Sequence, residues 1–321
     1  MEKFTQFRDR GSGIAPFIPV TTETSLVSKL LHTALFFFRL PILLSYATVY
    51  FLFLEYLPLP AALRKLLLWG FMCIPGIWWV DLQLDGVRRG HLSEQPPNRI
   101  PHARSVIAAN FTSPIDAIYL AAIFDPVFTV SYPRSRLLRQ VSLFQAIIHA
   151  LSPPALTPPP GARLTDIETL LAKNPKRAIA VFPECSTTNG KAILPPSPSL
   201  LTTPAETQIF PVSIRYSPAD VTTPVPSRWF SFLWTLLSKP TICVRVRIAE
   251  GTTNTSATPR SSNAAVSSSV DVSSGPAKIT MSERLVLDHV SEALARLGRS
   301  RRVGLTLEDK AQFVEAWNGK R

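Results

Sequence analysis

The sequence predicts an α/β protein: a mostly parallel β-sheet flanked by helices, with an N-terminal membrane hairpin. Two observations predict the sheet. Short apolar, β-prone runs at 105–109 and 178–182 each end in a polar turn, and an apolar helical run at 117–123 follows the first of them. This strand–turn–helix order is typical of parallel sheets. A third observation, the long apolar stretch over residues 30–80, predicts the hairpin.

The first 80 residues divide into a polar N-terminal segment, 1–29, and a membrane-anchoring helix pair, 30–80. The run from Thr33 to Leu54 is long enough for a helix of about 20 residues that spans a bilayer. A proline loop at 57–60 separates it from a shorter apolar run at 66–80, whose tryptophans favour a membrane interface. The alternative is a pair of helices buried within a soluble protein. Basic residues on both sides of the pair, with Arg88 and Arg89 after it, favour a cytosolic location for the domain that follows.

The charge balance points to an anionic partner. The chain of 321 residues has 34 Lys and Arg against 22 Asp and Glu, a net charge of +12, and its mean hydropathy is +0.16. Because the basic residues are scattered, without the aromatic and arginine cluster typical of nucleic-acid binding, we expect membrane lipid as partner and no nucleic acid. The three cysteines are widely spaced, which predicts neither a disulfide framework nor a metal site.

The first polar turn, residues 110–116, reads N-F-T-S-P-I-D and follows a strand directly. Polar side chains at the carboxyl end of a strand are where α/β proteins usually build their sites. Asn110, Ser113 and Asp116 are therefore candidate functional residues. The alternative is an ordinary helix start at which Thr112 and Ser113 cap the helix.

The second polar turn follows the strand at 178–182 and contains Glu184. A lone carboxylate cannot bind a phosphate, so we expect donors and positive charge from the residues that follow it. These candidate substrate-binding residues are Thr187, Thr188, Asn189 and Lys191. The alternative is a capping glutamate beside a turn.

The rest of the chain completes the predicted domains. The α/β domain covers 81–250, with a helix that carries Arg134, Arg136 and Arg139 and ends at Leu151, and an edge strand at 241–248. Residues 251–278 are rich in Ser and Thr and predict a disordered loop. Residues 279–321 predict a peripheral pair of C-terminal helices.

In their order, these blocks resemble the glycerolipid acyltransferases of the PlsC/LPLAT type. That family has an N-H-x-S-x-x-D turn, an F-P-E-G-T turn and an apolar strand with a proline, matched here by Asn110 to Asp116, by Phe182 to Glu184 and by Pro211. The N-terminus also resembles that of fungal lysophosphatidic acid acyltransferase relatives of lipid droplets. The family's second, arginine-bearing block has no clear counterpart between Phe128 and Arg163.

The resemblance implies acyl transfer from acyl-CoA, as co-substrate with no bound cofactor, to a lysophospholipid, with lysophosphatidic acid favoured. It also implies a membrane location, at the endoplasmic reticulum, lipid droplets or both. In the family a histidine takes the acceptor's proton and the aspartate, here Asp116, orients it. Phe111 occupies the position of that histidine, and a phenyl ring cannot accept a proton.

Three alternatives remain open for the chemistry. Another group serves as base, with Asp116 itself, His102 and His149 as candidates. Or positioning alone supports slow transfer. Or the fold has lost catalysis and remains a lipid- or acyl-CoA-binding membrane protein.

Overall fold

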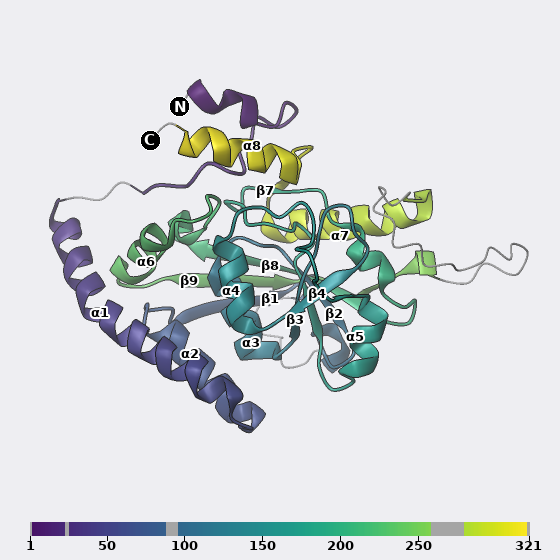
Figure 1. The fold of residues 1–321 in the computed structure, drawn as a ribbon, viewed down its shortest axis with the longest axis horizontal. Coiled ribbons are helices and arrows are strands. Elements are labelled where there is room, and N and C mark those ends of the chain that lie inside the picture. The colour runs from purple at the N-terminus through teal and green to yellow at the C-terminus, as the bar shows by residue number, and fades with distance from the viewer. Residues whose placement is uncertain (1, 23–25, 88–95, 258–278, 320–321) are drawn as a thin grey trace, which may run out of the picture.

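The computed structural model describes residues 2–22, 26–87, 96–257 and 279–319. Its centre is a nine-stranded mixed sheet in the order β1-β9-β8-β2-β6-β3-β4-β5, with β10 paired to β8 (Figure 1). The strands of this sheet are β1 Trp79–Leu84, β2 Val106–Ala109, β3 Val127–Val130, β4 Leu138–Val141, β5 Leu164–Thr165, β6 Ile179–Val181, β8 Gln208–Ser217, β9 Cys243–Ile248 and β10 Thr252–Thr253. A separate parallel pair joins β7, Ala192–Ile193, to β11, Arg301–Arg302.

The four central strands, β8, β2, β6 and β3, are all parallel to their neighbours within that set. Antiparallel pairs occur toward the edges, between β8 and β9, β3 and β4, and β4 and β5. The predicted α/β class with a mostly parallel sheet flanked by helices is thereby confirmed. Because β2 and β6 are adjacent and parallel, the polar turns that follow them lie at the same edge of the sheet.

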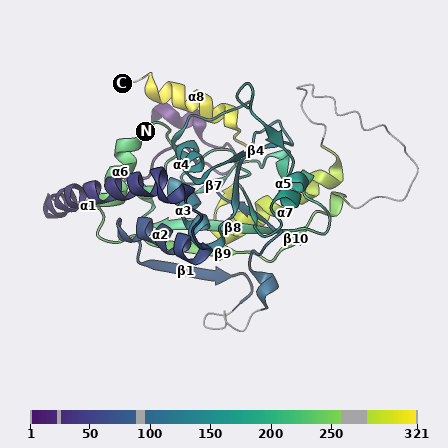
Figure 2. The same ribbon diagram turned by 60° about the horizontal axis from the view of Figure 1, so that its bottom comes forward.

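Helices cover both faces of the sheet (Figures 1 and 2). Alternate residues of β2 point to opposite faces. Ile107 and Ala109 pack in a cluster with α2, α3, α4 and α6, whereas Val106 and Ala108 pack in a second cluster with α5 and α7. The helices are α1 Leu26–Leu52, α2 Ala61–Cys73, α3 Pro114–Phe124, α4 Leu143–Leu151, α5 Ile167–Lys173, α6 Trp229–Ser238, α7 Met281–Gly298 and α8 Leu307–Asn318.

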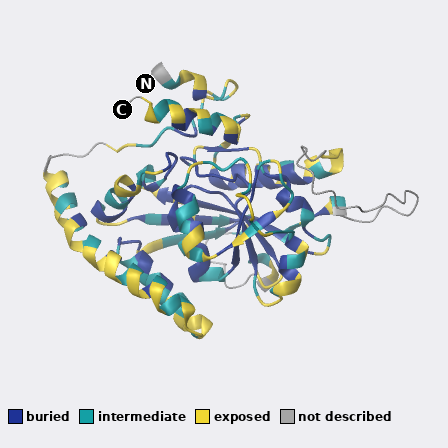
Figure 3. Ribbon diagram, in the orientation of Figure 1, coloured by how far each residue is buried: buried dark blue, intermediate teal, exposed yellow. Residues whose placement is uncertain are grey.

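The N-terminal helices differ in character. Within the described residues one helical stretch, Val27–Tyr56, is long and apolar enough to cross a membrane, and α1 carries most of its exposed residues (Figure 3). The helix begins inside the segment predicted as polar, 1–29. It also rests on the domain at two places, because Phe36 packs against Trp234 and Phe51, near the end of the helix, packs against Phe144.

The second arm of the expected hairpin, α2, packs against the α/β domain along one face. Helix α2 buries Leu68, Phe71 and Met72. Arg64 forms an ion pair with Asp125, and Lys65 Nζ donates to the Ile123 carbonyl at the end of α3. These contacts hold α2 against α3. The two basic residues of the expected hairpin loop therefore bond to protein groups.

Four further expectations differ from the structure. The predicted helix from Arg134 to Leu151 is a strand, β4, followed by α4, and Arg139 lies in the strand. The predicted edge strand at 241–248 is β9, which is an interior strand because it pairs with β1 on one side and with β8 on the other. Helix α7 is not peripheral, since nine of its residues are buried. The start of the expected loop at 251–278 forms β10, and residues 258–278, like Arg88 and Arg89, lie outside the described residues.

The two ends of the chain pack together. Phe7 and Phe17 contact the fully buried Phe313 of α8. The same cluster includes Ala192 and Leu194, which follow the Glu184 turn. Helix α8 and the N-terminal segment therefore form a layer over the edge of the sheet at which the polar turns lie (Figure 1).

Candidate functional site

Three loops converge at the carboxyl ends of β2 and β6. Glu184 Oε1 accepts a hydrogen bond of 3.1 Å from the Phe111 backbone N–H, and the Thr188 N–H donates to the Phe111 carbonyl at 2.9 Å. The Thr223 N–H donates to the Thr112 carbonyl at 2.8 Å. The two sequence blocks are thus hydrogen-bonded to each other, and the segment at 221–223 covers the first of them.

Asp116 is the third residue of α3, and its carboxylate is fully buried. Oδ2 accepts from the Thr112 and Ser113 N–H groups at 2.7 and 2.9 Å, and the Tyr216 hydroxyl donates to Oδ1. Burial raises the pKa of Asp116 to about 6, although the hydrogen bonds from these donors lower it. The carboxylate caps its own helix, and its side-chain partners are the hydroxyls of Tyr216 and Thr112 rather than a histidine.

Glu184 is also enclosed by backbone donors. Besides the Phe111 N–H, the Leu194 N–H donates to Oε2 at 3.1 Å. Burial raises the pKa of Glu184 to about 8; the nearby Asp116 raises it too, while Lys310 lowers it. The carboxyl group joins the turn after β6 both to the first block and to the segment that leads out of the turn.

Lys310 is a site residue that the sequence analysis missed. It is fully buried, and its Nζ donates to Ser186 Oγ at 2.7 Å and to the Thr187 carbonyl at 2.5 Å. Burial lowers its pKa to about 7, against the opposing effect of Glu184. A signal was present: Lys310 lies between Leu307 and Phe313 at a spacing of three residues, which places it on the apolar face of α8.

The predicted substrate-binding side chains hold the loops together. Both ends of the Asn110 amide bond to the Ile214 backbone, and Ser113 caps α3 and donates to the Val221 carbonyl. Thr187 Oγ1 donates to the Thr223 carbonyl, and the Gly190 N–H donates to Thr188 Oγ1. Asn189 donates to the carbonyls of Ala15 and Ile18 in the N-terminal segment. Of this set Lys191 alone is exposed. Their role in binding substrate stays a prediction.

Phe111 fills the position at which the resemblance expects a base. Its ring is fully buried and stacks on Phe182, with centroids 4.3 Å apart, and on His149 at 5.9 Å. Burial lowers the pKa of His149 to about 4, so its imidazole is neutral at pH 7 and has a lone pair. His102 precedes β2 and therefore lies at the opposite end of that strand, edge-on to Phe210. Of the two histidines, only His149 belongs to this site.

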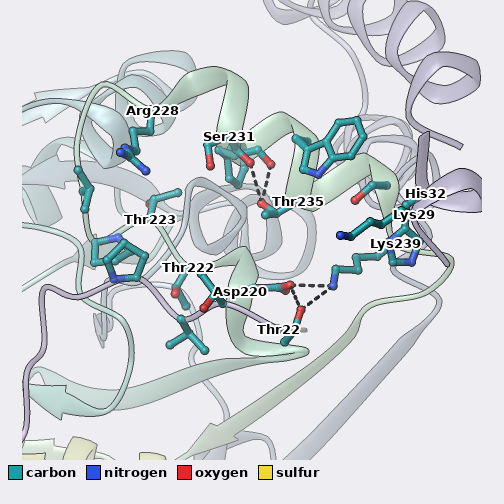
Figure 4. A pocket seen from close by; sticks show the side chains of 18 of the residues that line it. Thr22, Lys29, His32, Asp220, Thr222, Thr223, Arg228, Ser231, Thr235 and Lys239 are labelled. Carbon is teal, nitrogen blue, oxygen red and sulfur yellow. Dashed lines mark hydrogen bonds and ion pairs between the residues drawn. The ribbon is translucent and has the colours of Figure 1, made fainter. Parts of the chain in front are cut away.

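Two cavities adjoin the converging loops. One of about 340 Å³ is lined by Glu184, Cys185 and Arg134 together with residues at the start of α8. The other, of about 460 Å³, is lined by Thr222 and Thr223 and by residues of α1 and α6 (Figure 4). The described residues include no group of three or more His, Cys, Asp or Glu side chains that could hold a metal ion.

Cys185 occupies the position of the family's glycine. Its φ is 59°, in the left-handed region that favours glycine. Burial raises the pKa of its thiol to about 11. The thiol is therefore protonated at neutral pH and is not a nucleophile.

Comparison with known proteins identifies relatives with named activities. No family model matches the chain. A putative lysophosphatidic acid:oleoyl-CoA acyltransferase of Schizosaccharomyces pombe is 27% identical and covers 100% of this chain and 99% of its own. Lysophosphatidic acid:oleoyl-CoA acyltransferase 1 of Saccharomyces cerevisiae is 26% identical over 61% of this chain and 60% of its own. The crystal structure of the 1-acyl-sn-glycerophosphate acyltransferase PlsC from Thermotoga maritima aligns with 85% of this chain and 95% of its own, at 16% identity and a TM-score of 0.41.

Proposed function

Because the chain is a full-length relative of the PlsC/LPLAT-type glycerolipid acyltransferases, we propose that it transfers an acyl group from acyl-CoA to lysophosphatidic acid. The observation that carries the proposal is the extent of the similarity to the fission yeast protein. It covers α1 and the C-terminal helices as well as the sheet. The apolar outer face of α1 supports a reaction at a membrane, where both the acceptor and the acyl chain reside.

The reaction requires that a hydroxyl of the acceptor lose its proton while its oxygen bonds to the thioester carbon. The carbon–sulfur bond then breaks, and CoA leaves as a thiol once it gains a proton. Phe111 cannot take part in either proton transfer. His149 stacks on Phe111 and has a free lone pair at pH 7, although its pKa of about 4 makes it a weaker base than an ordinary histidine. We propose it as the base because it is the histidine at this site, with Asp116 holding the first block in shape.

A second candidate function rests on a different observation. Asp116 and Glu184 are both enclosed by internal donors, and Phe111 fills the space between His149 and Phe182. This arrangement favours a protein that binds lipid or acyl-CoA with little or no turnover. Such a protein would keep most residues of the two blocks that resemble the family, without the histidine that takes the proton there.

One assay separates the two functions. The purified protein in liposomes is given oleoyl-CoA and lysophosphatidic acid, beside the variants His149→Ala, Phe111→His and Lys176→Ala. We expect transfer by the natural protein, a loss of about 100-fold or more in His149→Ala, and no change in Lys176→Ala, which alters an exposed lysine away from the site.

The other outcomes are equally informative. An inactive natural protein that gains transfer in Phe111→His is a binding protein with an intact pocket. Full activity in His149→Ala overturns the assignment of the base. No transfer by any variant, with either lysophosphatidic acid or another lysophospholipid, overturns the acyltransferase proposal.

The proposed location follows from the same reasoning. We propose that the protein resides on the endoplasmic reticulum, lipid droplets or both, with its α/β domain in the cytosol. Fluorescence microscopy of the tagged full chain, with protease protection of the tag in sealed microsomes, tests both parts.

A further inference from the structure

The cavity of about 460 Å³ lies between the start of α1, helix α6 and the N-terminal segment at 19–22. Figure 4 shows it from close by. The described residues that line it include Lys29, Arg228 and Lys239, together with His32, and a single acidic residue, Asp220. Threonine and serine hydroxyls from 222–223 and from α6 line the space between them. The lining is therefore cationic and rich in hydrogen-bonding groups.

The basic groups are concentrated at one end. In Figure 4 the side chains of Lys29, His32 and Lys239 come together there, while Arg228 lies at the opposite end. Lys239 forms an ion pair of 2.7 Å with Asp220. Within the described residues no hydrogen bond or ion pair of the Lys29 ammonium is present. Positive charge thus remains beside the Asp220–Lys239 pair, as a phosphate would require.

Asp220 supplies a second, independent feature. Its side chain is only 7% exposed. Thr22 Oγ1 and Lys239 Nζ both contact Oδ2, whereas Oδ1 is buried and has no hydrogen-bond partner in the described part of the chain. Because a buried acceptor without a donor is costly, this oxygen calls for a ligand that donates a hydrogen bond. A hydroxyl next to the phosphate is such a donor.

The cavity also adjoins the candidate membrane-spanning stretch. It begins at the first turns of α1, where the stretch long enough to cross a membrane starts. Leu30 of α1 and Phe230 of α6 are strongly exposed beside it. Apolar side chains with basic groups next to them are the pattern of a surface that meets lipid headgroups.

We propose that this cavity binds the headgroup of an anionic membrane phospholipid whose phosphate carries a hydroxylated substituent. Lys29, His32 and Lys239 contact the phosphate, and Asp220 Oδ1 accepts a hydrogen bond from the hydroxyl. The binding is distinct from acyl transfer and does not depend on it. It would fix the height and rotation of α1 and α6 on the membrane.

The test compares two lipids of equal charge. The purified full chain is sedimented with phosphatidylcholine vesicles that contain either phosphatidylglycerol, which has headgroup hydroxyls, or phosphatidylmethanol, which has none. We expect phosphatidylglycerol vesicles to be bound about tenfold more tightly. Asp220→Ala should abolish this preference. Lys29→Ala should weaken binding to both anionic vesicles, whereas Lys176→Ala, which removes the same charge from an exposed site, should not.

The outcomes decide the proposal. Because Asp220→Ala also breaks the ion pair to Lys239, Lys29→Ala is the test that remains if that variant does not fold. Equal binding of the two anionic vesicles by the natural protein overturns the hydroxyl contact. Equal effects of Lys29→Ala and Lys176→Ala overturn the phosphate contact. If sn-glycerol 3-phosphate displaces the protein from vesicles as effectively as lipid does, the site takes a soluble phosphate and the lipid assignment is wrong.

Discussion

At the scale of single residues, the site is a set of ionisable groups from which water is excluded. Asp116, Glu184 and Lys310 are each fully buried or nearly so, and each has hydrogen-bond partners. Burial shifts the pKa of all three toward the neutral form. Folding therefore changes proton binding at these residues, and stability must depend on pH.

Glu184 gives the clearest pH dependence. Its pKa in the folded protein, about 8, lies above the ordinary value of 4.5. Its contribution to stability is thus complete below pH 4.5 and is lost as pH rises to about 8. In Glu184→Gln one backbone N–H loses its acceptor, so we expect the free energy of unfolding at pH 5 to fall by about 1–3 kcal/mol. The difference from the natural protein should shrink toward pH 8.

Thermal unfolding in detergent over this pH range measures that difference. Glu206→Gln, which alters an exposed glutamate, is the control and should follow the natural protein. Lys310 has the opposite effect on the pH dependence. Because its pKa is lowered from 10.5 to about 7, its contribution to stability increases as pH rises between these two values. A gap between Glu184→Gln and the natural protein that stays constant from pH 5 to 8 would show that Glu184 is ionised throughout.

The sequence identified these residues unevenly, for physical reasons. Asp116 and Glu184 follow apolar strands, so their position at strand ends could be inferred from local pattern alone. Lys310 lies 126 positions beyond Glu184 in the chain, and only the packing of α8 brings the two together. Tyr216 contacts Asp116 from the end of β8, a contact that depends on strand order. Sequence periodicity specifies a face of an element, not its partner.

At the scale of elements, α1 combines a face that packs on the domain with a face that is exposed. Phe36 contacts α6, whereas the adjacent Phe37 and Phe38 are 66% and 69% exposed. If the exposed face meets lipid, replacing both by glutamate must bring two charges to an apolar surface. We expect Phe37→Glu/Phe38→Glu to bind phosphatidylcholine vesicles about tenfold or more weakly.

The control for this variant is Met281→Glu/Leu285→Glu, because these two exposed apolar residues lie on α7. It changes charge and hydrophobicity equally at a different surface. Vesicle sedimentation measures both. Equal binding by the two double variants would mean that α1 is covered by something other than lipid.

The elements that the sequence predicted best are those with a strong local pattern. The strands that lead into the two blocks, and the capping of α3 by Ser113, follow from apolar runs and cap chemistry. The region after β3 was predicted wrongly because no glycine or proline separates the short strand β4 from helix α4, so nothing in the local sequence marks the end of the strand. The location of β9 inside the sheet depends on its pairing with β1, which no local signal specifies.

At the scale of the whole molecule, the chain ends act together on the site. The N-terminal segment packs on α8, and α8 inserts Lys310 into the turn after β6. Asn189 of that turn in turn bonds to the carbonyls of Ala15 and Ile18. The turn that carries Glu184 is thus held in place both by the N-terminal segment and by α8.

This arrangement predicts that a substitution near the N-terminus loosens the site. Phe17 is fully buried against Phe313, so Phe17→Ala should lower the free energy of unfolding by about 3–5 kcal/mol. Because α8 then packs less tightly, we expect faster hydrogen exchange at Ser186–Asn189 as well as in α8, measured by mass spectrometry at pH 7. Leu285→Ala, at an exposed position of α7, is the control. Faster exchange confined to the N-terminal segment would mean that the turn keeps its shape without the chain ends, and that β6 and the first block alone determine the geometry around Glu184.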